Sequence, residues 1–205
     1  MAAIETSLLM LLRQFGYLAL FFIIFAESGL FFGFFFPGDS LLFTAGLLAS
    51  QGYFDIAVVL FGVCLAAILG DSVGYWSGKK FGPRFFSKPG DFFRDPQHIQ
   101  EAQAFYKKHG KLSIVLARFV PVVRTFAPIA AGIGKMEYSV FLKFNIIGGI
   151  GWGVLFTGFG YILGTTLPDA ENYLLPIVIV IIVISLLPMA WSLGKNRMAV
   201  RARAH

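Results

Sequence analysis

Apolar stretches long enough to cross a lipid bilayer dominate this sequence and restrict its fold more than any other feature. They cover roughly residues 14–36, 41–50, 56–78, 112–134, 140–164 and 174–193. A helix needs about 20 apolar residues to cross the hydrocarbon core, and its backbone polar groups must be bonded internally. Because 57% of the residues are hydrophobic and only 14% are charged, we expect an all-α polytopic membrane protein, with residues 1–205 forming a single membrane domain.

Positive charge gathers in two polar stretches, residues 79–111 and 194–205. Cytoplasmic loops of membrane proteins collect Lys and Arg, so we predict that both the basic loop and the C-terminal tail are cytoplasmic. Topology explains this charge better than nucleic-acid binding does, and contact with anionic lipid headgroups is compatible with it. The loop is also predicted to contain an amphipathic helix that starts at residues 95–96 and lies along the membrane surface.

Three apolar stretches separate the loop from the tail, whereas two cytoplasmic segments require an even number of crossings between them. The stretch containing "RFVPVVRTFAP" is the candidate that does not cross. Pro121 and Pro128 each remove a helix hydrogen bond, and Arg118 and Arg124 disfavour exposure to lipid. We therefore predict a re-entrant hairpin on the cytoplasmic side, with a break at Pro121 that lets both arginines point into one cavity.

In the first half of the chain, charged residues and a proline likewise interrupt an apolar stretch, "ESGLFFGFFFPGDSLLFTAG". Glu27 stands at one end, Pro37 and Gly38 signal a turn, and Asp39 with Ser40 is placed to cap a new helix. The apolar run that follows is too short to cross. The prediction is a second re-entrant hairpin that opens to the outer face, so that two inverted helical hairpins face each other.

Small residues recur at every fourth position of one predicted span, and their role is expected to be close helix packing rather than ligand binding. They are Gly62, Ala66, Gly70, Gly74, Gly78 and Gly82, and the spacing recurs at Gly149, Gly153, Gly160 and Gly164.

Ionisable side chains at membrane depth are the candidates for function. They are Glu27, Asp39, Asp71, Arg118 and Arg124. Each has a structural alternative: Asp39 as a helix cap, Asp71 as a residue of the cytoplasmic interface, and either arginine reaching toward the headgroups. Pro121 and Thr125, beside the arginines, are further candidates.

The charge of this set suggests a mechanism. Three carboxylates against two guanidiniums leave one surplus negative charge, so a carboxylate must bind a proton or a cation, or reach water. Arginine's planar fork suits phosphate, and a phosphate bound by Arg118 and Arg124 would favour protonation of Glu27 or Asp39. This is proton coupling in outline, although the residues alone do not separate protons from sodium.

Other chemistry has weak support in the sequence. His98 and His109 have no second ligand at metal spacing, and Cys64 is the only cysteine, so no metal site or cofactor is expected. No Ser-His-Asp, H-E-x-x-H or P-loop pattern is present, which favours a protein that is not an enzyme.

Four motifs together resemble the DedA family, the bacterial branch of the VTT-domain (SNARE-associated-like) membrane proteins. They are "FAESGLFFGFFFPGDSLLFTAGLLASQG", "GDSVGYWSGKKFGPRFF", "FYKKHGKLSIVLARFVPVVRTFAPIAAGIGKM" and "GYILG". The resemblance covers nearly the whole chain. Some relatives have Glu at the position of Asp39, and Asn is frequent at the position of Ser28.

The resemblance implies a multi-pass protein of the bacterial inner membrane with two facing re-entrant hairpins. It implies roles in envelope integrity and proton-motive-force homeostasis, and in moving lipids such as undecaprenyl phosphate between leaflets. Functional carboxylates of the family fall on Glu27 and Asp39, and functional arginines on Arg118 and Arg124.

The leading hypothesis is a proton-coupled flippase for a lipid with a phosphate headgroup, either undecaprenyl phosphate or a phospholipid. Arg118 and Arg124 would bind the phosphate, while Glu27 and Asp39 would couple protons. The alternatives are a proton-coupled exporter of small cations or drugs, a membrane polyprenyl pyrophosphate phosphatase and a passive scaffold. The sequence leaves open whether the chain acts alone or as a homo-oligomer.

Overall fold

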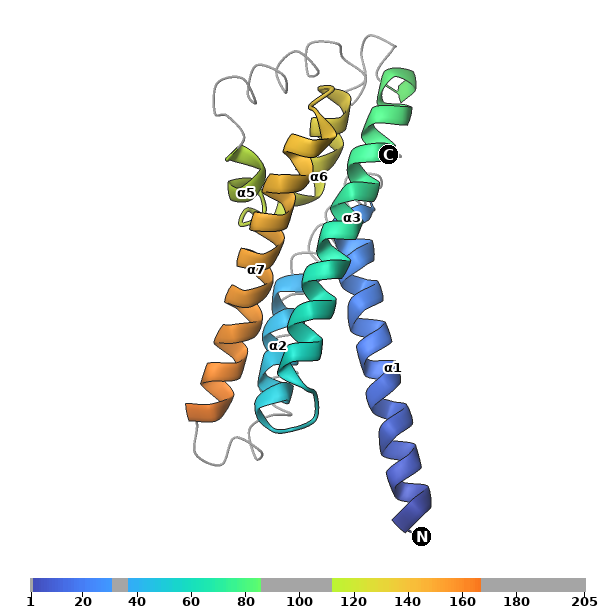
Figure 1. Cartoon of the computed structure of the whole chain (residues 1–205), viewed down its shortest axis with the longest axis vertical. Helices are drawn as coiled ribbons and strands as arrows, with labels where there is room; N and C mark the ends of the chain where they lie inside the picture. Colours follow the sequence, from blue (N-terminus) through green and yellow to red (C-terminus); the bar gives the residue numbers. More distant parts are fainter. Residues whose placement is uncertain (1, 31–36, 86–111, 167–205) are drawn as a thin grey trace, which may run out of the picture.

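A computed structural model describes residues 2–30, 37–85 and 112–166 (Figure 1). This described part is helical throughout and contains no strand, which confirms the predicted all-α class. Its helices are α1 (Ala2–Gly29), α2 (Gly38–Ser50), α3 (Ile56–Phe85), α5 (Ser113–Ala117), α6 (Pro121–Ile133) and α7 (Tyr138–Thr166). Within α3 and α7, the segments Ile56–Phe81 and Tyr138–Thr166 are long and apolar enough to cross a membrane.

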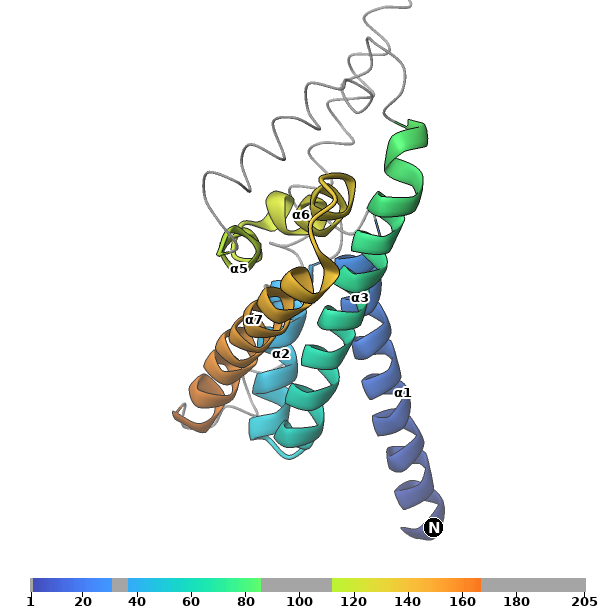
Figure 2. The same cartoon turned by 45° about the horizontal axis from the view of Figure 1, so that its top comes forward.

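The long helices α3 and α7 run along the length of the molecule, and the other helices lie beside one half or the other (Figures 1 and 2). α1 and α2 lie in the half that holds the N-terminus, and α5 and α6 lie in the opposite half. The most extensive packing joins α2 to α7, and α6 packs mainly on α3. α2 of the first half of the chain therefore rests on α7 of the second half, and α6 of the second half rests on α3 of the first, whereas α1 packs on α3 and α5 on α7.

The break predicted at Pro121 is confirmed. α5 ends at Ala117 and α6 begins at Pro121, with Val120 in the extended conformation that a residue before proline favours. Pro121 occupies the first turn of α6, where its missing N–H costs no helix hydrogen bond. Pro128, in contrast, does not interrupt α6, which continues to Ile133.

Two sequence interpretations are corrected by the helix boundaries. α2 begins at Gly38 and no side chain caps it, so the interpretation of Asp39 as a helix cap is wrong. α3 continues to Phe85, so residues 79–85 are helical rather than part of a loop. The predicted amphipathic helix at residue 95, the apolar stretch 174–193 and the basic tail 194–205 lie outside the described residues.

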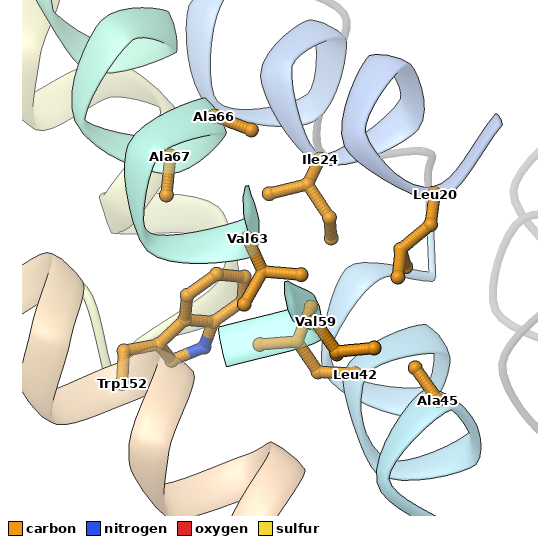
Figure 3. Close-up of a cluster of buried hydrophobic side chains, with 9 residues drawn as sticks. All are labelled: Leu20, Ile24, Leu42, Ala45, Val59, Val63, Ala66, Ala67 and Trp152. Atoms are coloured by element: carbon orange, nitrogen blue, oxygen red, sulfur yellow. The ribbon is translucent and has the colours of Figure 1, made fainter. Parts of the chain in front are cut away.

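Two buried apolar clusters form the core. The larger one joins α1, α2 and α3 to Trp152 of α7 (Figure 3), and its members are Leu20, Ile24, Leu42, Ala45, Val59, Val63, Ala66, Ala67 and Trp152. The smaller one, in the half of α5 and α6, contains Tyr75, Ile114, Ala131 and Phe141. Along both long helices a polar layer separates the clusters: Asp71 lies between them on α3 and Asn145 on α7.

Glycines allow the long helices to approach their neighbours, as the small-residue pattern predicts. A Cβ at Gly70 of α3 would overlap backbone atoms of Phe25, and one at Gly78 would overlap backbone atoms of Ile129. On α7, a Cβ at Gly160 would overlap the carbonyl group of Phe43 in α2. These positions are packing faces, because no side chain fits between the backbones.

We predict that Gly160→Ala destabilises the protein, because α2 and α7 must separate to admit the methyl group; overpacking of this kind costs about 1–3 kcal/mol. Gly158→Ala is the matched control on the same helix, since its Cβ would meet nothing within 4 Å. The control is expected to be neutral or stabilising by up to about 1 kcal/mol, because alanine is the better helix former. SDS-induced unfolding in mixed micelles measures both, and equal stability of the two variants would contradict the packing role of Gly160.

Candidate functional site

The polar layer between the two apolar clusters brings together all the ionisable residues predicted at membrane depth. They are Glu27 at the end of α1, Asp39 in the first turn of α2, Asp71 in α3, Arg118 directly after α5 and Arg124 in the first turn of α6. Charges removed from water are costly unless they are paired and hydrogen-bonded. In this layer, ion pairs between the arginines and the carboxylates offset this cost.

Arg124 joins the two halves of the chain. One Nη group of its guanidinium donates to Glu27 Oε1 and the other donates to Asp39 Oδ1. Glu27 is 1% exposed, whereas the side chain of Asp39 is 32% exposed. Because guanidinium–carboxylate bonds are among the strongest hydrogen bonds in proteins, this residue of α6 fixes the ends of α1 and α2 relative to each other.

Arg118 forms a second buried ion pair, and here the sequence missed a partner. Its Nη2 donates to the carboxylate of Asp71 and to Asn145 Oδ1, the latter at 2.6 Å. Asn145 Nδ2 in turn donates to the backbone carbonyl of Ile68 at 3.0 Å, which sets the orientation of its amide. Asp71 is thus buried in the polar layer, rather than facing an interface beside Lys79. A fully buried asparagine inside an apolar span was the signal available in the sequence.

Trp152 connects the two ion-pair groups and was also missed by the sequence analysis. Its indole Nε1 donates to Asp39 Oδ1 at 2.7 Å. Its ring centroid lies 5.1 Å from Cζ of Arg124 and 5.8 Å from Cζ of Arg118, within the range of cation–π attraction. Figure 3 shows the same ring packed against Val63 on its apolar side. A tryptophan in the middle of a span, away from the interfaces where Trp is usually enriched, was the signal in the sequence.

Glu27 has an oxygen that lacks a partner. Oε2 is buried and has no hydrogen bond among the described residues, whereas Asp39 Oδ1 accepts from both Arg124 and Trp152. A Cβ at Gly38 would overlap the Glu27 carboxylate, so glycine at this position leaves the space that the carboxylate occupies. Since Arg118 pairs with Asp71, the surplus negative charge is shared by Glu27 and Asp39 on Arg124, and the unpartnered oxygen belongs to Glu27.

A small cavity lies among these groups. Its volume is about 10 Å³, and it is lined by Ser28, Asp71, Ile114, Arg118, Arg124, Ala127, Pro128 and Trp152. The prediction that both arginines face one cavity is therefore confirmed. The space admits about one water molecule and is far too small for a phosphate group. Thr125 is 1% exposed and is not among the residues that line the cavity. Within the described part of the chain, no three His, Cys, Asp or Glu side chains gather as a metal site would require.

Comparison with known proteins gives a consistent assignment. The VTT domain family model matches residues 36–162. The chain is 43% identical over 206 residues to Protein DedA of Escherichia coli K12, covering 98% of this chain and 93% of that protein. It is 46% identical over 166 residues to Uncharacterized membrane protein ML0287 of Mycobacterium leprae, covering 81% and 74%. It is also 33% identical over 150 residues to Inner membrane protein YqjA of Escherichia coli K12, covering 73% and 68%. No solved structure shows significant similarity.

A double-mutant cycle tests the buried pair of Arg118 and Asp71. Either Arg118→Met or Asp71→Leu leaves one charge buried without its partner, and we expect each to lower the free energy of unfolding by about 3–5 kcal/mol. The double variant is expected to lose less than the sum of the two, since no charge is left unpaired. SDS-induced unfolding gives the three values.

The control is Lys80→Met, which removes an exposed cation from the same helix as Asp71 and is expected to change stability by less than about 0.5 kcal/mol. Additivity of the two core substitutions within about 0.5 kcal/mol would show that the charges are not coupled.

Proposed function

Because the chain belongs to the DedA family of VTT-domain membrane proteins, we propose that it is a proton-coupled transporter that moves a lipid with a phosphate headgroup between leaflets. Undecaprenyl phosphate is the leading substrate, the bacterial inner membrane is the location, and support of envelope integrity is the result. The observation that supports this most directly is the bridge from Arg124 to both Glu27 and Asp39. A phosphate group can compete with these carboxylates for the same guanidinium.

Two helical hairpins are the moving parts in this proposal. α1 with α2 forms a hairpin that enters the membrane from the outer face, and α5 with α6 forms one that enters from the cytoplasmic face. Their tips meet at the charge cluster, as in transporters that hold their site at the midplane between inverted halves. The placement of the two units in opposite halves of the molecule supports this arrangement.

The headgroup site is Arg118 with Arg124. Both guanidiniums face the small cavity, and each is now occupied by carboxylate oxygens. In this proposal, the conformation seen here is an occluded state, because its cavity of about 10 Å³ has no room for cargo. Cargo enters when one hairpin tip withdraws and the phosphate replaces a carboxylate on Arg124, an exchange between two ligands that guanidinium binds in the same planar geometry.

Displacement of the Glu27 carboxylate from Arg124 would couple proton uptake to lipid binding. Once Arg124 turns to phosphate, Glu27 loses its hydrogen-bond donor while staying in an apolar surrounding, which disfavours the ionised form. Glu27 then takes up the proton, with Asp39 keeping the Trp152 indole as a donor. Release of the lipid on the other side returns Arg124 to Glu27 and expels the proton. One proton therefore accompanies each phosphate in this cycle, which needs no covalent chemistry and hence no enzyme activity.

The central test is movement of undecaprenyl phosphate in proteoliposomes, read out by a membrane-impermeant phosphatase that acts only on the outer leaflet. Arg124→Gln removes two charge-assisted hydrogen bonds and is expected to slow the movement by at least about tenfold. Lys143→Gln removes an exposed cation from α7 and is expected to match the unsubstituted protein.

Three outcomes contradict the proposal. An unchanged rate in folded Arg124→Gln would remove the arginine from the mechanism. Movement of a cationic drug that is unaffected by Arg118→Gln would favour a cation exporter. Release of phosphate from undecaprenyl pyrophosphate without the added phosphatase would favour an enzyme.

The pH dependence of lipid binding tests the role of Glu27 separately. Protonated Glu27 no longer holds Arg124, so binding of undecaprenyl phosphate is expected to strengthen from pH 8 to pH 6. Native mass spectrometry of the purified protein measures this binding. Glu27→Gln mimics the protonated state at every pH, so any remaining pH dependence in this variant belongs to other groups, such as Asp39 or the phosphate of the lipid. A pH dependence equal in Glu27→Gln and the unsubstituted protein would show that Glu27 does not carry the proton.

A further inference from the structure

A second hollow, much larger than the cavity in the charge cluster, lies where α3 passes the turn from α6 to α7. Its volume is about 560 Å³ and its described lining residues are Lys79, Gly132, Ile133, Lys135, Met136, Glu137 and Tyr138. None of these residues lines the small cavity between the arginines. The turn from α6 to α7, which supplies most of the lining, lies toward the end of the molecule opposite the N-terminus (Figures 1 and 2). Its size falls in the range of sites for small molecules and headgroups.

The charge of the lining is positive. Lys79 of α3 and Lys135 of the turn face the hollow together with one carboxylate, Glu137. Glu137 Oε1 accepts a hydrogen bond from Ser139 Oγ at 2.6 Å, which stabilises the carboxylate within its own turn of chain. No ion pair between either lysine and a carboxylate is present in the described part of the structure. Among the described residues, no carboxylate therefore competes with an anion for either ammonium group.

The backbone conformation of Lys135 is the strongest local indication that its side chain has a binding role. Its φ of 55° places it in the left-handed region, which costs a residue with a side chain and suits glycine. Gly134, directly before it, has an ordinary φ of −69° and does not take this conformation. The turn therefore holds a lysine at a position whose left-handed backbone conformation favours glycine or asparagine.

One aromatic ring, that of Tyr138, lines the hollow, and Trp76 lies beside two of its lining residues, Lys79 and Tyr138. Nζ of Lys79 lies 4.9 Å from the ring centroid of Trp76, and the rings of Trp76 and Tyr138 are 5.3 Å apart. Trp and Tyr beside cations are typical of the level of the lipid headgroups. From Trp76 an exposed apolar stripe runs down α3, formed by Val58, Phe61, Leu65, Leu69 and Val73. An acyl chain can lie along this stripe while its headgroup reaches the lysines.

We propose that this hollow binds the phosphate group of an anionic lipid, with Lys79 and Lys135 as its cationic ligands and Tyr138 as its aromatic wall. The lipid's chains lie on the exposed stripe of α3. The site is distinct from the charge cluster and does not depend on the transport function. Lys79, Lys80 and Lys135 give this described part of the molecule a positive charge, and anionic lipids are attracted to such clusters at the cytoplasmic face of a membrane.

The test compares binding of phosphatidylglycerol with that of diacylglycerol of the same acyl chains, by native mass spectrometry of the full chain. Lys79→Gln with Lys135→Gln is expected to weaken phosphatidylglycerol binding by roughly 25-fold, about fivefold for each lysine. Lys80→Gln with Lys143→Gln is the matched control, since it removes two exposed lysines that do not line the hollow. The control is expected to retain the preference for phosphatidylglycerol.

A variant of the turn separates binding from folding. Lys135→Gly suits the left-handed backbone, so it is expected to unfold at the same or a higher SDS concentration and yet to lose about fivefold in phosphatidylglycerol binding. An equal loss in the control double variant would reduce the site to general charge attraction and overturn the proposal. Displacement of the lipid by millimolar inorganic phosphate would assign the hollow to a soluble anion, which also overturns it.

Discussion

The Arg124 guanidinium, held between Glu27 and Asp39, is the interaction on which the rest of the structure depends. It belongs to α6, whereas its partners end α1 and begin α2, so one side chain ties together two helical units of opposite halves. Trp152 of α7 completes the junction by donating to Asp39 and covering the guanidinium. Loss of Arg124 would leave the buried carboxylate of Glu27 and the half-buried carboxylate of Asp39 without their cation, a costly defect in a membrane interior.

The apolar clusters explain why such a junction is stable. One cluster lies on each side of the polar layer, and glycines let α3 and α7 press against the short helices. Packing therefore closes the site until only about 10 Å³ remains. Under the proposed function, a site this tight requires an exchange of partners, in which cargo replaces a carboxylate on the arginine and the displaced carboxylate binds a proton. Substrate and proton are coupled through the same guanidinium in this account.

The sequence predicts those residues of the candidate site that carry a charge inside an apolar stretch. Glu27, Arg118 and Arg124 are conspicuous in apolar runs, and Pro121 identifies the break that brings the arginines to one cavity. Asp39 was also predicted as a functional carboxylate, but its position in the first turn of a helix fitted a cap as well, and only its bond with Arg124 in the folded chain removes that alternative. Asn145 and Trp152 were missed since neither carries charge, and their importance comes from partners more than 20 residues away in the chain.

The most direct measurement is a solid-state NMR distance experiment on the protein in bilayers, with ¹⁵N in the arginine guanidiniums and ¹³C in the glutamate carboxyl groups. The account predicts a close nitrogen–carbon contact that disappears in Glu27→Gln. Adding undecaprenyl phosphate should weaken this contact in the unsubstituted protein and replace it with a contact between guanidinium nitrogen and phosphorus. A glutamate contact that is absent without lipid, or one that survives unchanged while the phosphorus contact forms, would contradict the exchange at Arg124.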